Sequence, residues 1–446
     1  MTPVYFQKNV FKEQQQRLWS YVTRDEERNF PLAFEGRIEL RQEIKDRVTE
    51  LESSNKPASC TYVVQGAPGA GKTSLLKQLE LDLSGKKNVS IVKLSPAELT
   101  NTSTVLGKFL DGQPVNINRL RNAYNYKRDA QFGANTGFFK LVGGLNVQIP
   151  SLDQRVLTHP TEIWRILDSL LDATRRSTFV MLVDEAQRVA DDKNMDCAAT
   201  ITAIHDGDTE SVKIVPVFAG LSDASVALGS VGITRSARKD RVIRGLSKEE
   251  ASSVVKKTLS TLRIGDVFSS EDNENIAQQL AYISDGWPRH LHQYQHALVA
   301  EIYRKQQNSD PCIDLDHVLE EGHENRVSYY DDRLKRSNQG YLEPQLSELA
   351  KEFSAEQMIE EEIILDKLEE NPRVERYSNK SKEVLDTFVH NGIFEMPQSG
   401  RYRFSIPSLH GYLSLDRDFE RVRATLRIKA REFQLDSSGD SDPPAL

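Results

Sequence analysis

The sequence has few cysteines, no long apolar run and no excess of positive charge. Its 446 residues include only Cys60, Cys197 and Cys312, which lie far apart and form no CxxC pair. This spacing excludes a disulfide-built scaffold and a cysteine-ligated metal site. It is typical of reduced thiols in the cytoplasm.

Two further absences concern membranes and nucleic acid. No segment approaches the ~20 apolar residues of a membrane span, and residues 1–30 are charged throughout, without the apolar core of a signal peptide. The net charge of −8 argues against a chain that binds polyanions over its whole surface, although a local basic face remains compatible with it. We expect a soluble, cytoplasmic protein that contacts no membrane.

Buried-strand patterns alternate with helical patterns in the first half of the chain. Apolar strands are predicted at 61–65, 88–94, 179–183 and 213–219, with helices between them. This alternation is typical of an α/β fold with a doubly wound parallel sheet.

We predict five segments in all. They are an N-terminal helix at 1–30, an ATPase core at 31–245, a helical lid at 246–308, a winged-helix-like α+β domain with a terminal helix at 309–435, and a disordered tail at 436–446. An insertion at about 107–160 contains two β-like runs, 138–142 and 145–149, which predict a hairpin. The insertion is either a packing element or a pore or substrate loop.

The strand at 61–65 leads into a glycine-rich loop that fits the pattern GxxxxGK[ST]. The loop consists of Gly66, Ala67, Pro68, Gly69, Ala70, Gly71, Lys72 and Thr73. Glycines allow successive backbone N–H groups to point at one anion, and the following helix directs its N-terminus at the same phosphates. We expect Lys72 to reach the β- and γ-phosphates of ATP, Thr73 to bind Mg²⁺, and Ser74 to lie on the α-phosphate side.

Two acids follow the apolar strand at 179–183. Asp184 is expected to hold Mg²⁺ and Glu185 to act as general base for the attacking water. An acid pair that merely begins a solvated loop is the alternative. Because the chain also carries the phosphate loop, the pair favours hydrolysis over binding alone.

Polar and basic residues after the next strand supply further candidates. Ser222 or Asp223, after the strand at 213–219, is a candidate contact to the γ-phosphate, with an ordinary polar strand end as the alternative. Arg235 or Arg238 is a candidate to stabilise transition-state charge on the γ-phosphate of a neighbouring subunit. In a monomer the same arginines form a solvated basic face.

A Gly-Trp-Pro-Arg turn at 286–289 begins another helix. Arg289 lies early in that helix and is predicted to fold back onto the bound nucleotide. His290, His292 and His296 follow, but no HExxH pattern accompanies them, so we interpret them as packing or surface residues.

These motifs resemble those of the AAA+ ATPases, a branch of the ASCE division of P-loop NTPases. The order FEGR, GAPGAGKT, VDEAQ, AGLSD, the arginine segment and GWPRHL is similar to the origin-recognition or initiator-type and STAND-like bacterial branch, over about residues 30–305. The resemblance implies Walker A and Walker B roles for Lys72 and Asp184, a second-sensor role for Arg289, and an adenine pocket lined by residues 34–37. Ser222 departs from the asparagine common at the first-sensor position.

The C-terminal pattern of helix, strand, turn and strand at 381–413 resembles a winged helix. Its candidate recognition helix, 382–391, is not basic, so only Arg401, Arg403 and the arginines of the terminal helix are available to contact DNA. The main hypothesis is an ATP-hydrolysing switch that forms homo-oligomers with ATP and engages a protein partner. A DNA-binding initiator or transposition-type regulator, and a STAND-like defence scaffold with little net hydrolysis, are the alternatives.

Overall fold

The computed structural model describes most of the chain. The described residues are 4–5, 12–22, 33–53, 60–100, 104–105, 108–109, 136–140, 146–150, 178–191, 197–206, 213–233, 238–308, 312–336, 340–374 and 380–414. Contacts divide the chain into two compact units. The sheet unit comprises Arg37–Gly66 and Leu75–Ile243, and the helical unit comprises Met1–Gly36, Ala67–Ser74 and Arg244–Leu446.

The sheet unit is built on a five-stranded parallel sheet. Its strands are β2 (Thr61–Gln65), β3 (Val89–Leu94), β6 (Thr178–Val183), β7 (Lys213–Gly220) and β8 (Arg238–Val242). The order is β3-β6-β7-β2-β8, and all four pairings are parallel. The predicted α/β fold with a parallel sheet is confirmed.

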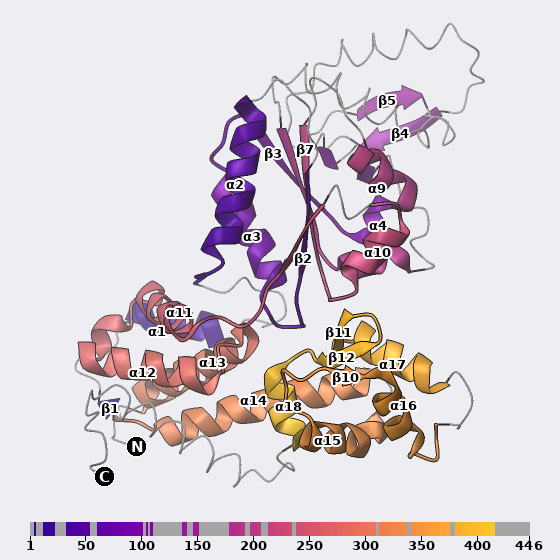
Figure 1. Ribbon diagram of the computed structural model, residues 1–446. Helices are drawn as coiled ribbons and strands as arrows, with labels where there is room; N and C mark the ends of the chain where they lie inside the picture. The colour runs from indigo at the N-terminus through magenta and orange to yellow at the C-terminus, as the bar shows by residue number, and fades with distance from the viewer. Residues whose placement is uncertain are drawn as a thin grey trace, which may run out of the picture. The chain divides into compact units, whose positions relative to one another are not determined.

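Helices cover both faces of this sheet. They are α2 (Ile38–Ser53), α3 (Lys72–Leu83), α4 (Pro96–Leu99), α9 (Cys197–Asp206) and α10 (Ala224–Ser230). Figure 1 shows α2 and α3 on one face and α4, α9 and α10 on the other. Strands β2, β6 and β7 are buried at every position, because side chains on both of their faces are covered by helices.

Strand β8 was not among the predicted strands. It reads Arg-Lys-Asp-Arg-Val, and it lies at one edge of the sheet beside β2. Its charges are satisfied locally, since Lys239 and Arg241 donate to Glu43 of α2 over 3.0 and 2.7 Å. Although burial raises the pKa of Glu43, the hydrogen bonds from Arg241 and Lys239 leave it below its ordinary value. An edge strand can carry charge where a central strand cannot.

The predicted hairpin is present in the insertion. Strands β4 (Thr136–Lys140) and β5 (Asn146–Pro150) pair antiparallel, with Lys140 opposite Asn146. The first strand begins two residues before, and the second one residue after, the predicted start. A helix predicted at 160–175 lies outside the described residues.

The helical unit begins with α1 (Lys12–Val22), which lies in the segment predicted as an N-terminal helix. The segment predicted as a lid contains α11 (Lys248–Thr261), α12 (Ser270–Ile283) and α13 (Pro288–Gln307). Ser247 and Glu250 form a reciprocal capping box that begins α11, and Ser269 caps α12. A shared apolar core, including Leu18, Val255 and Tyr294, holds these helices together.

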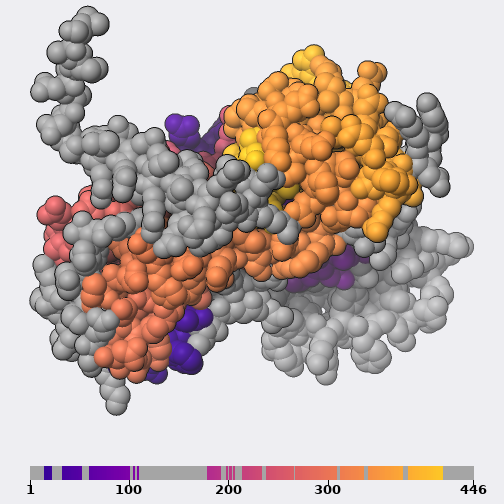
Figure 2. Space-filling view, turned by 90° about the horizontal axis from the view of Figure 1, so that it is seen from below, coloured from indigo at the N-terminus to yellow at the C-terminus, as the bar shows by residue number. Residues whose placement is uncertain are grey.

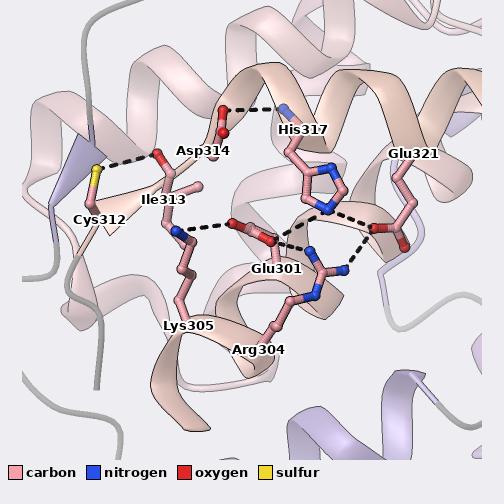
Figure 3. A network of polar contacts seen from close by, with 8 residues as sticks. All are labelled: Glu301, Arg304, Lys305, Cys312, Ile313, Asp314, His317 and Glu321. Carbon is pink, nitrogen blue, oxygen red and sulfur yellow. Dashed lines mark hydrogen bonds and ion pairs between the residues drawn. The ribbon is translucent and has the colours of Figure 1, made fainter. Parts of the chain in front are cut away.

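A charged network fixes the connection from α13 to α14 (Leu315–Arg336). Glu301 is 1% exposed; it accepts from Arg304 over 2.6 Å and lies 3.8 Å from Lys305. His317 lies 3.9 Å from both Glu301 and Glu321, and Arg304 also donates to Glu321 (Figure 3). A buried carboxylate is tolerated only with such partners, so the network holds this corner of the unit in place.

The C-terminal part of the helical unit adds helices around a small antiparallel sheet. The helices are α15 (Glu343–Glu352), α16 (Glu361–Glu369), α17 (Lys380–His390) and α18 (Pro407–Ser414). The sheet contains β10 (Ile359–Glu360), β12 (Arg401–Phe404) and β11 (Phe394–Gln398), in that order. Its core is aromatic, and the rings of Phe394 and Phe404 lie 4.8 Å apart. In Figure 2 the orange atoms of α14 adjoin the lighter orange atoms of the helices that follow.

Candidate functional site

The glycine-rich loop connects β2 to α3. Gly66 ends the first segment of the sheet unit, where its N–H donates to the carbonyl of Gly220 on β7 over 3.2 Å. Gly69 and Gly71 have φ angles of +82° and +93°, which a residue with a Cβ adopts only under strain. The N–H of Ala70 donates to Ala67 over 3.2 Å. The loop therefore turns tightly onto itself, as a phosphate-binding loop must.

Lys72 and Thr73 begin α3. Lys72 is 9% exposed, and its Nζ donates to the carbonyl of Ala67 over 3.1 Å, so the ammonium group lies against the inner side of the loop. Thr73 is exposed and Ser74 half-buried. A buried ammonium group next to a glycine turn is suited to bind an anion there.

The predicted Arg289 does lie beside this loop. Its N–H donates to the carbonyl of Gly69 over 3.2 Å, and a Cβ added at Gly69 would lie 2.8 Å from the Arg289 Cβ. The preceding turn is held by Gly286, whose carbonyl accepts from Leu246 over 2.7 Å. Tertiary packing thus brings the start of α13 to the loop, although more than 200 residues separate them in sequence.

The Arg289 guanidinium stacks on an aromatic ring from α14. Its Cζ lies 5.4 Å from the centre of the Tyr329 ring, and Arg333 lies 5.2 Å from the same centre. Arg333 also donates to the carbonyl of Asn391, immediately after α17, over 2.6 Å. The sequence analysis missed Tyr329 because no motif links it to the loop.

Asp184 and Glu185 follow β6, as predicted from the sequence. Glu185 has φ +56° and ψ +38°, a left-handed conformation that is uncommon for a residue with a side chain. Its N–H donates to the Asp184 carboxylate over 2.9 Å, and the Glu185 side chain is 51% exposed. Left-handed backbone at residues other than glycine is often found at functional sites.

Gln187 is a residue of this site that the sequence analysis missed. It is 6% exposed, its Nε2 donates to Glu185 over 2.8 Å, and its Oε1 accepts from the N–H of Leu221 over 3.0 Å. A Cβ at Gly220 would lie 2.7 Å from the same Oε1. Gln187 therefore ties the acid pair to the end of β7, and only its position in VDEAQ pointed to it.

Ser222 lies just after β7. Its carbonyl accepts from Gln65 Nε2, at the end of β2, over 2.6 Å. Because β2, β6 and β7 are parallel, their carboxyl ends share one edge of the sheet, where Gly66, Glu185 and Ser222 lie. The side chain of Ser222 is half-buried.

Of the two arginines proposed to reach a neighbouring subunit, the structure describes one. Arg235 lies outside the described residues. Arg238 lies on β8 with its side chain 5% exposed, pairs with Asp240 over 2.9 Å, and donates to the carbonyl of Ser225 over 2.8 Å. These contacts hold the Arg238 side chain within its own sheet unit.

The three histidines of α13 have separate surroundings. His292 and His296 contact α1, through the hydroxyl of Tyr21 over 3.3 Å and the carbonyl of Val22 over 3.0 Å. His290 is buried and contacts Tyr330 of α14 and Ser408 of α18.

Both contacts of His290 are 3.0 Å long, to the hydroxyls of Tyr330 and Ser408. Burial, together with the positive charges of Arg326 and Arg289, holds the pKa of His290 well below its ordinary value. His290 is therefore neutral and links α13, α14 and α18 into one buried network.

Solved structures, not sequence families, reveal what the chain is similar to. No family model and no curated protein matches the sequence. The Walker-type ATPase of Pyrococcus abyssi aligns with 85% of this chain and 96% of its own, at 13% identity and a TM-score of 0.50. The chain shares the fold of this Walker-type ATPase.

Weaker likenesses were also found. The ORC2 protein of Aeropyrum pernix, in ADPNP and ADP complexes, is 12% identical over 92% of this chain and 98% of its own, with a TM-score of 0.49. The ORC1 protein of Aeropyrum pernix in complex with DNA is 13% identical over 91% and 98%, with a TM-score of 0.40. The shared fold rests on the first likeness and on the parallel sheet and loop described above.

Proposed function

We propose that this protein is an ATP-binding and ATP-hydrolysing AAA+ switch. The observation that carries the proposal is the loop ahead of α3, with left-handed Gly69 and Gly71, the buried Lys72 ammonium group and the adjoining start of α13. Backbone N–H groups turned inward by such glycines, together with a helix N-terminus, suit the di- or triphosphate of a nucleotide.

Magnesium is the metal that the donor set fits. Thr73 contributes a hydroxyl at the start of α3, and Asp184 contributes a carboxylate at the end of β6, and hard oxygen donors of this kind are those that Mg²⁺ prefers. When bound, the ion neutralises charge on the phosphates. We assign Thr73 and Asp184 as its protein ligands.

Glu185 is the proposed general base. Its carboxylate accepts a proton from the water that attacks the γ-phosphate, while Lys72 holds the phosphate chain. The left-handed backbone at Glu185 and the hydrogen bond from Gln187 orient this carboxylate. Ser222 is proposed as a polar contact at the same sheet edge, and Arg289 as the nucleotide-sensing arginine of the lid.

The switch itself is proposed to act through oligomers and a partner. The lid helices and the winged-helix-like helices α15–α18 belong to one compact unit, so a change at the loop has a packed route to the C-terminal surface. We propose that ATP promotes homo-oligomers, in which Arg235 is the remaining candidate for a trans arginine.

A protein partner is favoured over DNA at the winged-helix-like end. Arg401 pairs with Glu360 over 2.8 Å, and Arg403 lies 17% exposed against Glu395. Lys382 of α17 pairs with Glu361 over 3.0 Å. Phosphate contacts need cations whose charge is not already neutralised. We therefore propose a protein partner, and the experiment below also measures whether the chain responds to DNA.

The test measures ATP binding, turnover and size on the full chain. Lys72→Ala should lower turnover by roughly 10²–10³-fold, since it removes a phosphate donor. Glu185→Gln should bind ATP normally but turn it over roughly 10²–10⁴-fold more slowly. Lys77→Ala, also on α3, and Glu39→Gln, exposed on α2, are matched controls that should behave as wild type.

Light scattering with and without ATP, and turnover with and without duplex DNA, complete the experiment. ATP-dependent oligomers support the switch. Stimulation by DNA that is lost in Arg401→Ala would instead favour the initiator-type regulator, and slow turnover with no ATP-dependent oligomer would favour a signalling scaffold. A wild-type chain that binds no ATP, or a Lys72→Ala variant that turns it over normally, would sink the proposal.

A further inference from the structure

Trp287 carries a buried donor with no acceptor. The side chain is 4% exposed, and among the described residues no acceptor lies within hydrogen-bonding reach of its Nε1. Leaving a buried N–H without an acceptor forfeits its hydrogen bond to water, and native structures contain few such groups. Trp287 Nε1 is one of several such buried polar atoms among the described residues, and its position beside the candidate phosphate loop makes a bound ligand its natural acceptor.

The unpaired N–H lies against the phosphate loop. A Cβ added at Gly69 would lie 2.9 Å from Trp287 Nε1, closer than real Cβ contacts come. On the other side of the same turn, Pro288 lies 3.9 Å from the Cβ position of Gly71. Since the Arg289 N–H donates to the Gly69 carbonyl, the two residues that follow Trp287 both lie against the loop and hold the indole beside it.

The chemistry of the position calls for an anionic acceptor. The indole N–H only donates, so its partner must be an acceptor atom. Trp287 is also the N-cap of the 20-residue helix α13, which has no side-chain cap, so the positive end of a long helix lies at the same place. A phosphate oxygen held by the loop meets both requirements.

We propose that Trp287 is a nucleotide-binding residue whose indole N–H donates to a phosphate oxygen of the nucleotide in the loop. The assignment rests on the proposed binding of ATP. The indole N–H would then contact the phosphates together with the Arg289 side chain and the N-terminus of α13. The assignment also gives a reason for glycine at position 69, because any side chain there would displace the indole.

The first test compares ATP and ADP affinities by calorimetry. Trp287→Phe keeps an aromatic ring and removes the donor, so both affinities should fall roughly 10- to 100-fold, as for one hydrogen bond to a charged group. Trp19→Phe is the matched control, since Trp19 is 52% exposed on α1, and it should leave both affinities unchanged.

A second measurement uses the unmodified chain, in case Trp287→Phe fails to fold. The chain has three tryptophans, so ¹⁵N-tryptophan labelling gives three indole N–H signals. The Trp19→Phe and Trp164→Phe variants assign two of them, and the third belongs to Trp287. The Trp287 signal should move with ATP, ADP and pyrophosphate, and not with adenosine.

Three results separate the outcomes. A shift with adenosine but not pyrophosphate overturns the phosphate assignment. Normal ATP binding in Trp287→Phe, with no shift of the Trp287 signal in the wild type, overturns the inference while leaving the proposed function intact. A wild-type chain that binds no ATP overturns both the inference and the proposed function.

Discussion

The side-chain amide of Gln187 donates to the carboxylate of Glu185 over 2.8 Å, while its oxygen accepts the N–H of Leu221. The acid that follows β6 is thereby tied to the end of β7. A buried amide with both ends occupied has one orientation, so it sets the direction of the Glu185 carboxylate. Gln187 is therefore a positioning residue for the proposed base.

Gln187→Ala should slow ATP turnover by roughly 10- to 100-fold while leaving the ATP dissociation constant within a factor of two or so, because a misdirected base affects chemistry more than binding. It should also destabilise the chain by roughly 1–3 kcal/mol, since the Leu221 N–H loses its acceptor. Steady-state kinetics and urea unfolding measure the two effects. Gln78→Ala, whose amide contacts Asp82, is the control, and an equal loss of turnover there would contradict the assignment.

Gly69→Ala should abolish nucleotide binding. The φ of +82° disfavours any side chain, and the new Cβ would lie 2.8 Å from the Arg289 Cβ. We expect a loss of roughly 1–3 kcal/mol in unfolding free energy, from strain of this kind. Gly85→Ala has nothing within 4 Å and should be near neutral in unfolding and in ATP titration. Wild-type affinity in Gly69→Ala would mean that the loop does not bind phosphate in this conformation.

The Tyr329 ring should matter more than its hydroxyl. Tyr329→Leu removes the surface on which Arg289 stacks, an interaction worth roughly 0.5–2 kcal/mol, and should lower kcat/KM for ATP about 2- to 30-fold. Tyr329→Phe keeps the ring and loses only the bond from Arg333, so its kcat/KM should stay close to the wild-type value. The expectation fails if the two variants are equally impaired.

The stability of the chain should fall as the pH is lowered from 7 to 5.5. The folded-state pKa of His290 lies well below 6.5, because burial and the charges of Arg326 and Arg289 oppose protonation. Below pH 6.5 the unfolded chain therefore takes up a proton that the folded chain does not. Each such histidine contributes a slope of up to about 1.4 kcal/mol per pH unit.

His323 supplies the matched comparison for this slope. Burial, aided by Arg326, lowers its pKa to about 4, so it adds a second proton of the same sign over this range. His290→Gln and His323→Gln should each reduce the slope of unfolding free energy against pH by about one proton, measured by urea unfolding. A slope unchanged in His290→Gln would show that this residue titrates normally in the folded chain.

Local pattern was enough for the parallel sheet. Strands β2, β6 and β7 are buried on both faces and so appear in the sequence as continuous apolar runs, and α9 follows its helical periodicity. Strand β8 was not predicted because an edge strand tolerates charge, and its Lys239 and Arg241 are paired with Glu43 of α2. The burial of the Arg238 side chain likewise comes from the tertiary structure.

Contiguous sequence motifs were enough to predict the candidate phosphate loop and the acid pair. Gly66–Thr73 and Asp184–Glu185 are local motifs, and their backbone geometry follows from glycine conformation and strand ends. Only the tertiary structure decided which distant side chains serve them: Gln187 reaches β7, and Trp287 and Arg289 reach Gly69. These contacts join residues that are far apart in sequence, so they form only when the chain folds. No local pattern shows which backbone a side chain such as Gln187 or Trp287 will lie against.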